Sequence, residues 1–247
     1  MRFQLQNLKE LVMLMKNKLY DVVYIVKEDP NNEELRYSIR SIEENFPVRY
    51  IWIFGYCPKW LGNVIYVPVK QDGDKWSNSK KLFETIANAS FLPDQFVLFN
   101  DDFFVMEKVD KPEHHYSGLL IDRVEELEEK FKNTSPLYAS QLRQVYDRLQ
   151  ELGIKEPKNY ALHTPMPFFR PEMKKSLELT KDLPMSLRSF YANYFNVGGV
   201  EGPDCKVFRL GEYNVKGPYL STDDRTFRLG RVGRDIRAKF NKPSSHE

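Results

Sequence analysis

The stretch FVLFNDDFFV, residues 96–105, places two adjacent aspartates, Asp101 and Asp102, between two runs of apolar residues. Aspartate is rare inside strands, and a carboxylate in apolar surroundings is costly. The apolar residues up to Phe99 predict a buried strand over residues 95–99 that ends at Asn100 and the two carboxylates. The strand would therefore belong to the core, and the carboxylates would belong to the edge of its sheet.

Apolar runs of strand length precede this strand and alternate with segments of helical periodicity. We predict strands at residues 21–26, 50–55 and 63–69, and helices at residues 33–45 and 79–90. Continuously apolar strands that alternate with helices are typical of βαβ units, in which helices cover both faces of a parallel sheet. The expected fold class is therefore α/β, with a mainly parallel, Rossmann-like sheet flanked by helices.

The rest of the chain is expected to be mostly helical. An amphipathic helix over residues 5–19 either docks on its own domain or binds a partner or a membrane. Further helices are predicted at residues 119–133, 136–152, 172–180 and 186–195. Ser135 is the expected N-cap of the second of these, and Gly153 its stop. The proline-rich stretch HTPMPFFRP, residues 163–171, is expected to interrupt regular structure, and short strands and loops are expected from about residue 205.

Composition limits the classes of function. The chain has 247 residues and is 41% hydrophobic, which suits one large domain or a domain with a helical insert. A net charge of +2 does not indicate a nucleic-acid or membrane partner. Cys57 and Cys205 lack the spacing of a disulfide framework or a zinc site, and the apolar run LVMLM, residues 11–15, is too short for a signal peptide or a membrane span. We expect a soluble, cytoplasmic protein with reduced thiols.

The carboxylate pair suits a divalent cation. In open α/β sheets, ligands bind at the carboxyl ends of the strands, where Asn100, Asp101 and Asp102 are predicted to lie. Two carboxylates this close repel each other unless a cation neutralises them, and Mg²⁺ or Mn²⁺ takes one or two carboxylates together with a substrate's phosphates. Such a site suits a nucleoside-diphosphate donor, whose leaving charge the metal stabilises. The alternative is a pair of capping or turn aspartates at a strand end.

A series of motifs in this sequence resembles a known family. In order, they are DVVYIV, ELRYSIRSIEENFP, IWIFGYCPKWL, WSNSKKLFETI, FVLFNDDFF, HTPMPFFRPEM and SLRSFYANYF. They are similar to the conserved regions of the Stealth family of capsular-polysaccharide sugar-phosphate transferases and, more loosely, to GT-A glycosyltransferases. His163, Arg188 and Tyr194 fall on the family's pattern, whereas residues 26–29 and 76–79 depart from it. The resemblance implies a GT-A-like fold, a nucleotide-sugar donor and metal-dependent transfer.

Candidate donor-binding residues are spread over the predicted helices and strand ends. They are Asp29, Arg40, Asn78, Lys81, Asn100, Asp101 and Arg188. Asp29 follows the first strand, although an Asp-Pro pair also initiates turns. Arg40 matches an arginine of the family motif and shares a helix face with Arg36; pairing with surface glutamates is the alternative to binding phosphates. Asn78 and Lys81 stand at a helix start, which favours anions, and a plain capped surface helix explains them equally well.

Three residues are candidates for acid–base chemistry. The resemblance implies a role for His163, either as a third metal ligand or as the general base that activates an acceptor hydroxyl, whereas a lone histidine is more often structural. Asp223 and Asp224 lie in STDDRTF, residues 221–227, and are further candidates. An Asx turn or a helix N-cap is the alternative for this pair. His114 and His115 are expected to be loop residues.

The C-terminal region carries an arginine at every third position. This arginine strip comprises Arg225, Arg228, Arg231, Arg234 and Arg237, with Lys239 beyond. Gly230 and Gly233 argue against one continuous helix. The strip has the charge to hold a diphosphate, an anionic acceptor or a DNA backbone, and a solvated surface is the alternative.

Together these features predict a single GT-A-like transferase domain over residues 1–247. Residues 20–118 would form the nucleotide-sugar-binding half, and residues 119–247 a helical, acceptor-side half. Asp102, Asp101 and His163 would hold Mn²⁺ or Mg²⁺, and the sugar would pass to a hydroxyl of a glycan, a lipid-linked molecule or a nucleic acid. Sugar-1-phosphate transfer, the Stealth activity, is the alternative chemistry. An inactive nucleotide- or sugar-binding module is the alternative from another class.

Overall fold

The structure is a computed structural model that describes residues 19–131, 137–183 and 187–247. The predicted helix over residues 5–19 falls almost wholly outside these ranges, as do Ser135 and Pro136 at the predicted start of a later helix. Among the described residues, no helix is long and apolar enough to cross a membrane.

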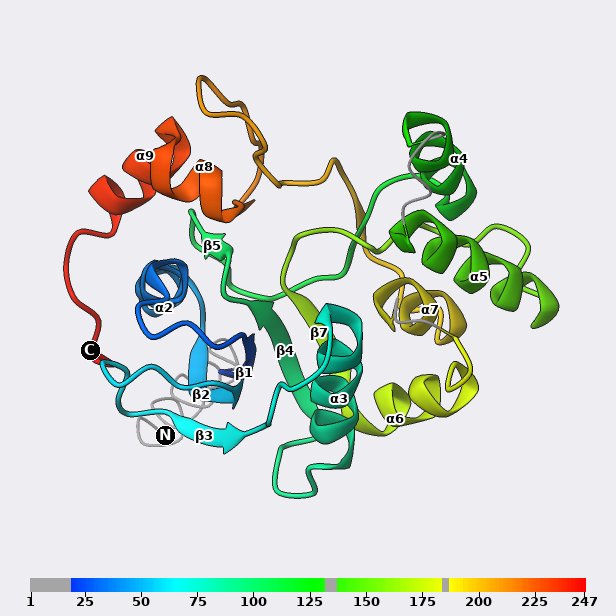
Figure 1. Cartoon of the computed structure of the whole chain (residues 1–247), viewed down its shortest axis with the longest axis horizontal. Coiled ribbons are helices and arrows are strands. Elements are labelled where there is room, and N and C mark those ends of the chain that lie inside the picture. The colour runs from blue at the N-terminus through cyan, green and yellow to red at the C-terminus, as the bar shows by residue number, and fades with distance from the viewer. Residues whose placement is uncertain (1–18, 132–136, 184–186) are drawn as a thin grey trace, which may run out of the picture.

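A five-stranded sheet forms the centre of the molecule, and its strand order is β3-β2-β1-β4-β7 (Figure 1). The strands are β1 (Tyr20–Val26), β2 (Val48–Gly55), β3 (Ile65–Pro68), β4 (Gln95–Asn100) and β7 (Met166–Phe169). The first four are mutually parallel, and β7 is antiparallel to β4. The predicted α/β class with a mainly parallel sheet is confirmed.

Helices cover the sheet because alternate side chains of β1 enter two different cores. Val22 and Tyr24 pack with the apolar face of α2 (Glu33–Asn45), whereas Val23 packs with that of α3 (Lys75–Asn88). Asn32 caps the start of α2, and Asp74 caps α3 by accepting hydrogen bonds from the backbone N–H groups of residues 76 and 77. The helix predicted at residues 33–45 is confirmed in full, and that at residues 79–90 begins earlier, because Asp74 supplies a cap ahead of it.

The proline-rich stretch, residues 163–171, was predicted to interrupt regular structure, and the structure contradicts this in part. Four of its residues form β7, at the edge of the sheet, where Pro167 lies opposite Val97. An edge strand tolerates proline because one side of its backbone needs no partner strand. The strand then leads directly into α6 (Arg170–Leu179), with Pro171 in the first turn.

Helices dominate the part that follows residue 119, as predicted. They are α4 (Leu120–Lys130), α5 (Leu137–Glu151), α6 and α7 (Leu187–Tyr194). Figure 1 shows them grouped beyond the β7 edge of the sheet. Apolar side chains of α4, α5 and α7, including Val124, Leu142 and Phe190, form a core of their own.

The C-terminal region corrects one prediction. Instead of only short strands and loops from about residue 205, it contains α8 (Asp224–Leu229) and α9 (Arg231–Lys239). Short strands are also present: β5 (Phe103–Val105) pairs with β9 (Tyr219–Ser221), and β6 (His115–Tyr116) pairs with β8 (Val200–Glu201). His115 therefore lies in a strand and not in the predicted loop. The break between the two helices at Gly230 agrees with the prediction that the arginine strip is not one helix.

Candidate functional site

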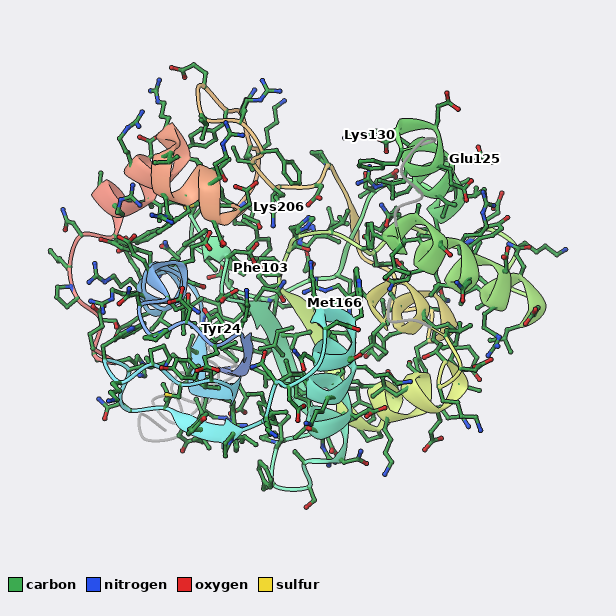
Figure 2. All side chains as sticks on the ribbon, in the orientation of Figure 1. Tyr24, Phe103, Glu125, Lys130, Met166 and Lys206 are labelled. Atoms are coloured by element: carbon green, nitrogen blue, oxygen red, sulfur yellow. The ribbon has the colours of Figure 1, made fainter. Side chains whose placement is uncertain are left out.

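The carboxyl end of β4 delivers the two aspartates to a partly enclosed position. Asn100, the last residue of β4, pairs with Ile25 of β1, and the chain then turns at Asp101 and Asp102 into the buried strand β5. Residues of α2 and β1 hold β5 in position. The Ser38 hydroxyl of α2 donates a hydrogen bond to the carbonyl of Phe103, and the same hydroxyl lies 2.7 Å from the Tyr24 hydroxyl of β1. Figure 2 labels Tyr24 and Phe103 at the two ends of this connection.

Asp102 has one oxygen bound and one oxygen free. Its Oδ2 accepts hydrogen bonds from Lys206 Nζ at 2.8 Å and from Ser221 Oγ at 3.1 Å. Its Oδ1 is buried and has no hydrogen-bond partner. A buried carboxylate oxygen without a donor is costly, so this atom is available to a ligand that the protein itself does not supply.

Two further carboxyl groups crowd the same region. Asp101 Oδ2 accepts a hydrogen bond from Asn32 at 2.9 Å, and burial, together with the charge of Asp102, raises the pKa of Asp101 to about 6. Glu34 accepts a hydrogen bond from the Thr222 hydroxyl at 2.6 Å. Burial raises the pKa of Glu34 to about 8, and the charges of Asp102, Asp101 and Asp224 add to the shift. We refer to Glu34, Asp101, Asp102 and Asp224 as the acidic cluster; a bound cation would offset the repulsion among these groups.

Two members of the acidic cluster, Asp102 and Asp101, have the donor chemistry for a hard divalent cation. Asp102 Oδ1 is a free oxygen donor, and Asp101 adjoins it, which matches the one or two carboxylates that Mg²⁺ or Mn²⁺ takes when phosphates and water complete its shell. Among the described residues, no group of three or more His, Cys, Asp or Glu side chains converges as a metal site. His163 is therefore not gathered with the two aspartates as a third ligand, contrary to that part of the expectation. Lys206 supplies a positive charge at Asp102 instead.

Arg188 lies close to this cluster and has an unused donor. Its Nη1 donates hydrogen bonds to the carbonyl oxygens of Leu162, at 3.1 Å, and Thr164, at 2.6 Å. The guanidinium carbon lies 5.4 Å from the centre of the Phe103 ring, and Nη2 is buried without a partner. Burial lowers the pKa of Arg188 to about 10, an effect that the charge of Asp102 opposes, so the group stays cationic near neutral pH. A fixed cation with a free N–H group suits a phosphate oxygen.

His163 forms a pair with Asp204, a residue that the sequence did not single out. The ring Nδ1 of His163 lies 2.7 Å from Asp204 Oδ2, and the backbone N–H of His163 donates to Asp204 Oδ1 at 2.9 Å. Burial opposes ionisation of Asp204, but the hydrogen bonds and charge of His163, together with the backbone N–H of Cys205, outweigh burial and lower the pKa of Asp204. Because Nδ1 faces Asp204, the other ring nitrogen, Nε2, is not engaged by this pair. The pair spans 41 residues of sequence, and no local pattern marks Asp204.

The two aspartates of the second Asp-Asp pair have different positions. Asp223 is the N-cap of α8, where its side chain accepts from the backbone N–H of Thr226 and completes a capping box. Asp224 is exposed on the first turn of α8, and its charge reaches Glu34 and Asp101. The structure therefore brings Asp224 to the acidic cluster and employs Asp223 as a cap.

The remaining donor-side candidates are not gathered at Asp102. Arg40 donates to the carboxylate of Glu247 from Nε, at 2.6 Å, and from Nη2, at 2.8 Å, so it ties α2 to the C-terminal tail. Asp29 is exposed and accepts a hydrogen bond from the backbone of Asn31. Asn78 closes the loop before α3 through Gly73, and Lys81 pairs with Asp72.

The arginine strip is partly neutralised by neighbouring acids. Arg231 pairs with Glu212 and Asp235, and Arg237 lies 3.9 Å from Glu33. Arg225 and Arg228 are exposed on α8. The strip therefore has fewer unpaired charges than the sequence alone indicates.

Comparisons with known proteins give structural similarity without sequence similarity. No protein-family model and no curated protein matches this sequence. The galactosyltransferase LgtC in complex with donor and acceptor sugar analogs has a TM-score of 0.43 and 12% identity, covering 71% of this chain and 70% of that chain. An active-site mutant of LgtC has a TM-score of 0.42 and 12% identity over 72% and 71%. The glycosyltransferase GlyE from Streptococcus pneumoniae has a TM-score of 0.40 and 8% identity over 91% of this chain and 50% of its own.

Proposed function

We propose that this protein is a metal-dependent glycosyltransferase of GT-A-like architecture that takes a sugar from a nucleotide-sugar donor and passes it to a hydroxyl acceptor. The observation that supports this best is the arrangement at the carboxyl end of β4. There, a free carboxylate oxygen of Asp102 lies in the same region as Lys206 and the unused Nη2 of Arg188. Cationic donors beside free carboxylate oxygens suit a diphosphate that is bound together with a cation.

The donor would bind with its diphosphate between these groups. Arg188 Nη2 and Lys206 Nζ would donate hydrogen bonds to the phosphate oxygens, and Asn100 would line the same edge. Asp29 lies in the loop that follows β1, and Asn78 and Lys81 lie in the first two turns of α3. All three remain proposed contacts to the nucleoside. Arg40 is omitted from this proposal because Glu247 already occupies its guanidinium.

The carboxylates of Asp102 and Asp101 would hold Mn²⁺ or Mg²⁺. When bound, the cation would neutralise the negative charge that develops on the leaving phosphate. Asn32, which donates to Asp101 Oδ2, leaves the second oxygen of Asp101 for this purpose.

His163 would be the general base. Its Nε2 would accept the proton of the acceptor hydroxyl as the acceptor oxygen bonds to the sugar's anomeric carbon. The bond from that carbon to the phosphate oxygen breaks, and its electron pair leaves with the nucleoside diphosphate. Asp204 would hold the imidazole in the required tautomer and stabilise its protonated form. Asp224, at the acidic cluster, is the alternative base, and the capping role of Asp223 makes it the weaker candidate.

Sugar-1-phosphate transfer is the second candidate reaction. It is supported by the Stealth-like motifs, because these include the segments that carry Asp102, His163 and Arg188. In this reaction the acceptor oxygen attacks the phosphorus next to the sugar, the bond between the two phosphates breaks, and a nucleoside monophosphate leaves. The same base, cation and arginine would serve it. The cytoplasmic location belongs to the same proposal, since both Cys57 and Cys205 are free thiols.

The nucleotide that is released tests this proposal. The protein is incubated with Mn²⁺ and a panel of nucleotide sugars, with water or simple sugars as acceptor, and the nucleotides are separated by chromatography. Release of nucleoside diphosphate that disappears in Asp102→Ala supports glycosyl transfer. Release of nucleoside monophosphate would show that the reaction is sugar-1-phosphate transfer and not glycosyl transfer. If no donor is turned over, the chain is a binding module, and the enzymatic proposal is wrong.

A further inference from the structure

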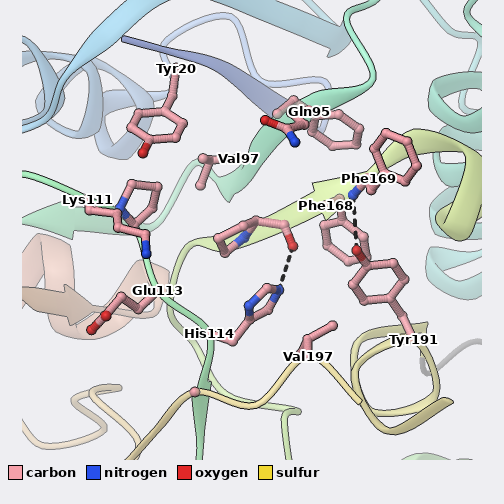
Figure 3. A pocket seen from close by; sticks show the side chains of 14 residues that line it. Tyr20, Gln95, Val97, Lys111, Glu113, His114, Phe168, Phe169, Tyr191 and Val197 are labelled. Atoms are coloured by element: carbon pink, nitrogen blue, oxygen red, sulfur yellow. Dashed lines mark hydrogen bonds between the residues drawn. The ribbon is translucent and has the colours of Figure 1, made fainter. Parts of the chain in front are cut away.

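A pocket of about 430 Å³ lies at the edge of the sheet opposite the acidic cluster. Its wall includes Gln95, which begins β4, and Phe169, which ends β7 and pairs with Gln95. Since Asn100 at the other end of β4 leads to the carboxylates, the length of the strand separates the two sites. Figure 3 shows the pocket between these strand ends and the segment that carries residues 111–114.

The walls of the pocket are held in place by specific contacts. The ring of His114 donates a hydrogen bond from Nε2 to the carbonyl of Pro167 at 2.9 Å (Figure 3). The carbonyl of His114 accepts a hydrogen bond from the backbone N–H of Val200, also at 2.9 Å. A Cβ atom at Gly199 would lie 2.3 Å from that carbonyl, so the close approach requires glycine. The Tyr191 hydroxyl accepts from the backbone N–H of Phe169 at 3.0 Å. The pocket is therefore formed before any ligand binds.

The lining of the pocket combines apolar side chains with hydrogen-bond donors and acceptors. The exposed ring of Phe169 and the half-buried Val197 form the apolar wall. Behind this wall lie the buried rings of Phe168 and Tyr191, whose centres are 4.5 Å apart. Lys111 and Glu113 are exposed at the pocket and form no hydrogen bond or ion pair with other residues that the structure describes. Burial lowers the pKa of His114, so its ring is neutral and its Nδ1 is an acceptor. The pocket thus offers an ammonium donor, a carboxylate acceptor and an imidazole acceptor, and the charges of Lys111 and Glu113 offset each other.

We infer that this pocket binds a neutral saccharide of one or two rings. The C–H face of a pyranose would lie against the apolar wall, and its hydroxyl groups, which both donate and accept, would match Lys111 and Glu113 together. A ligand with a single charge would be attracted by one of these two residues and repelled by the other. The volume lies within the range of about 300–1,000 Å³ that is usual for small-molecule pockets. This site is separate from the proposed transfer site, and the inference does not depend on the proposed reaction.

The test measures binding of neutral sugars to the full chain without donor or metal. Glucose, maltose, cellobiose and lactose are titrated by isothermal calorimetry and by ligand-observed saturation-transfer NMR. At least one of them is expected to bind, and Lys111→Ala and Glu113→Ala are each expected to weaken that binding about ten-fold, the loss of one hydrogen bond to a charged group. Asp102→Asn is expected to bind the sugar with unchanged affinity, because the strand separates the two sites.

Lys155→Ala and Glu156→Ala are the matched controls, since these residues are an exposed lysine and an exposed glutamate on another loop. The inference is overturned if none of the sugars binds at millimolar concentration, or if the controls weaken binding as much as the pocket variants. Loss of binding in Asp102→Asn would place the sugar in the transfer site instead. Tighter binding of glucosamine or glucuronate than of glucose would show that the pocket selects a charged ligand, and would equally overturn it.

Discussion

The carboxyl groups beside Asp102 are held at an energetic cost. Glu34 and Asp101 each have a pKa raised chiefly by burial, and the only cation in hydrogen-bond contact with Asp102 among the described residues is Lys206. Groups whose protonation is shifted by burial and by each other often mark functional sites, because ligand binding relieves the cost. The sequence predicted Asp101 and Asp102 from their place at a strand end. It did not predict Glu34 or Lys206, since these reach the cluster only through tertiary packing.

Replacing Glu34 by glutamine is expected to change how stability depends on pH. The pKa of Glu34 is about 8 in the folded chain and ordinarily 4.5, so between these values the unfolded chain loses its proton first. The free energy of unfolding of the parent therefore falls as pH rises from about 4.5 through 8. Each pKa unit corresponds to about 1.4 kcal/mol, so the fall reaches on the order of 5 kcal/mol.

Glu34→Gln cannot ionise and should lack this part of the fall, so urea denaturation at pH 5 and pH 8 measures it. Glu44→Gln, at an exposed glutamate of the same helix, is the control and should follow the parent. Equal pH dependence in Glu34→Gln and the parent would show that Glu34 is not buried as described.

The pair of His163 and Asp204 is expected to act as one unit. His163→Ala removes the base, and Asp204→Asn removes the negative charge beside Nδ1. Each change should lower kcat by about 10²-fold or more, the usual contribution of general base catalysis. The double variant should lose little more than either single variant, because residues that act together are not additive. Multiplied losses in the double variant would show that Asp204 does not act through His163.

At the scale of elements, the packing of α8 against α9 depends on glycine. A Cβ at Gly233 would lie 1.7 Å from the backbone oxygen of Phe227, although Gly233 is inside a helix where alanine is usually favoured. We therefore expect Gly233→Ala to destabilise the fold by about 2 kcal/mol, within the range for overpacking. Thermal unfolding measures the loss. Gly211→Ala is the control, because nothing lies within 4 Å of its added Cβ; an equal effect of the two substitutions would contradict this packing.

Helices α8 and α9 were missed because the glycines weaken the helical signal that their arginines and apolar residues carry. The glycines serve tertiary contact: Val232 and Ile236 are buried against Phe227 and Phe104, and close approach of the two helices requires glycine at 233. The N-cap role of Asp223 was weighed from the sequence and is the one that the structure shows. In these two helices, tertiary packing therefore overrides the low helix propensity of glycine. At the N-cap of α8, the local preference of aspartate and the observed structure agree.

At the scale of the whole molecule, the sheet was predictable because β1, β4 and the second half of β2 are buried on both faces and read as continuous apolar runs. The edge strand β7 was not, because Pro167 reads as a breaker and is acceptable only at an edge that the sequence does not reveal. The same distinction holds for the site. Residues that follow a strand end, such as Asp102, were predicted from position, whereas Asp204 and Lys206 depend on how β5 and β9 bring distant segments together.

The proposed function requires that the carboxyl edge of the sheet bind a nucleoside diphosphate together with a divalent cation. Isothermal calorimetry of UDP, GDP, CDP and ADP, with and without Mn²⁺, tests this at equilibrium and independently of turnover. At least one is expected to bind only with Mn²⁺, and Asp102→Asn should weaken that binding at least about thirty-fold, as expected when one partner of a buried charged contact is removed. Asp147→Asn, at an exposed aspartate of α5, should bind like the parent. If none of the four nucleotides shows Mn²⁺-dependent binding, or if Asp102→Asn binds with the same affinity as the parent, the proposed site for diphosphate and cation is wrong.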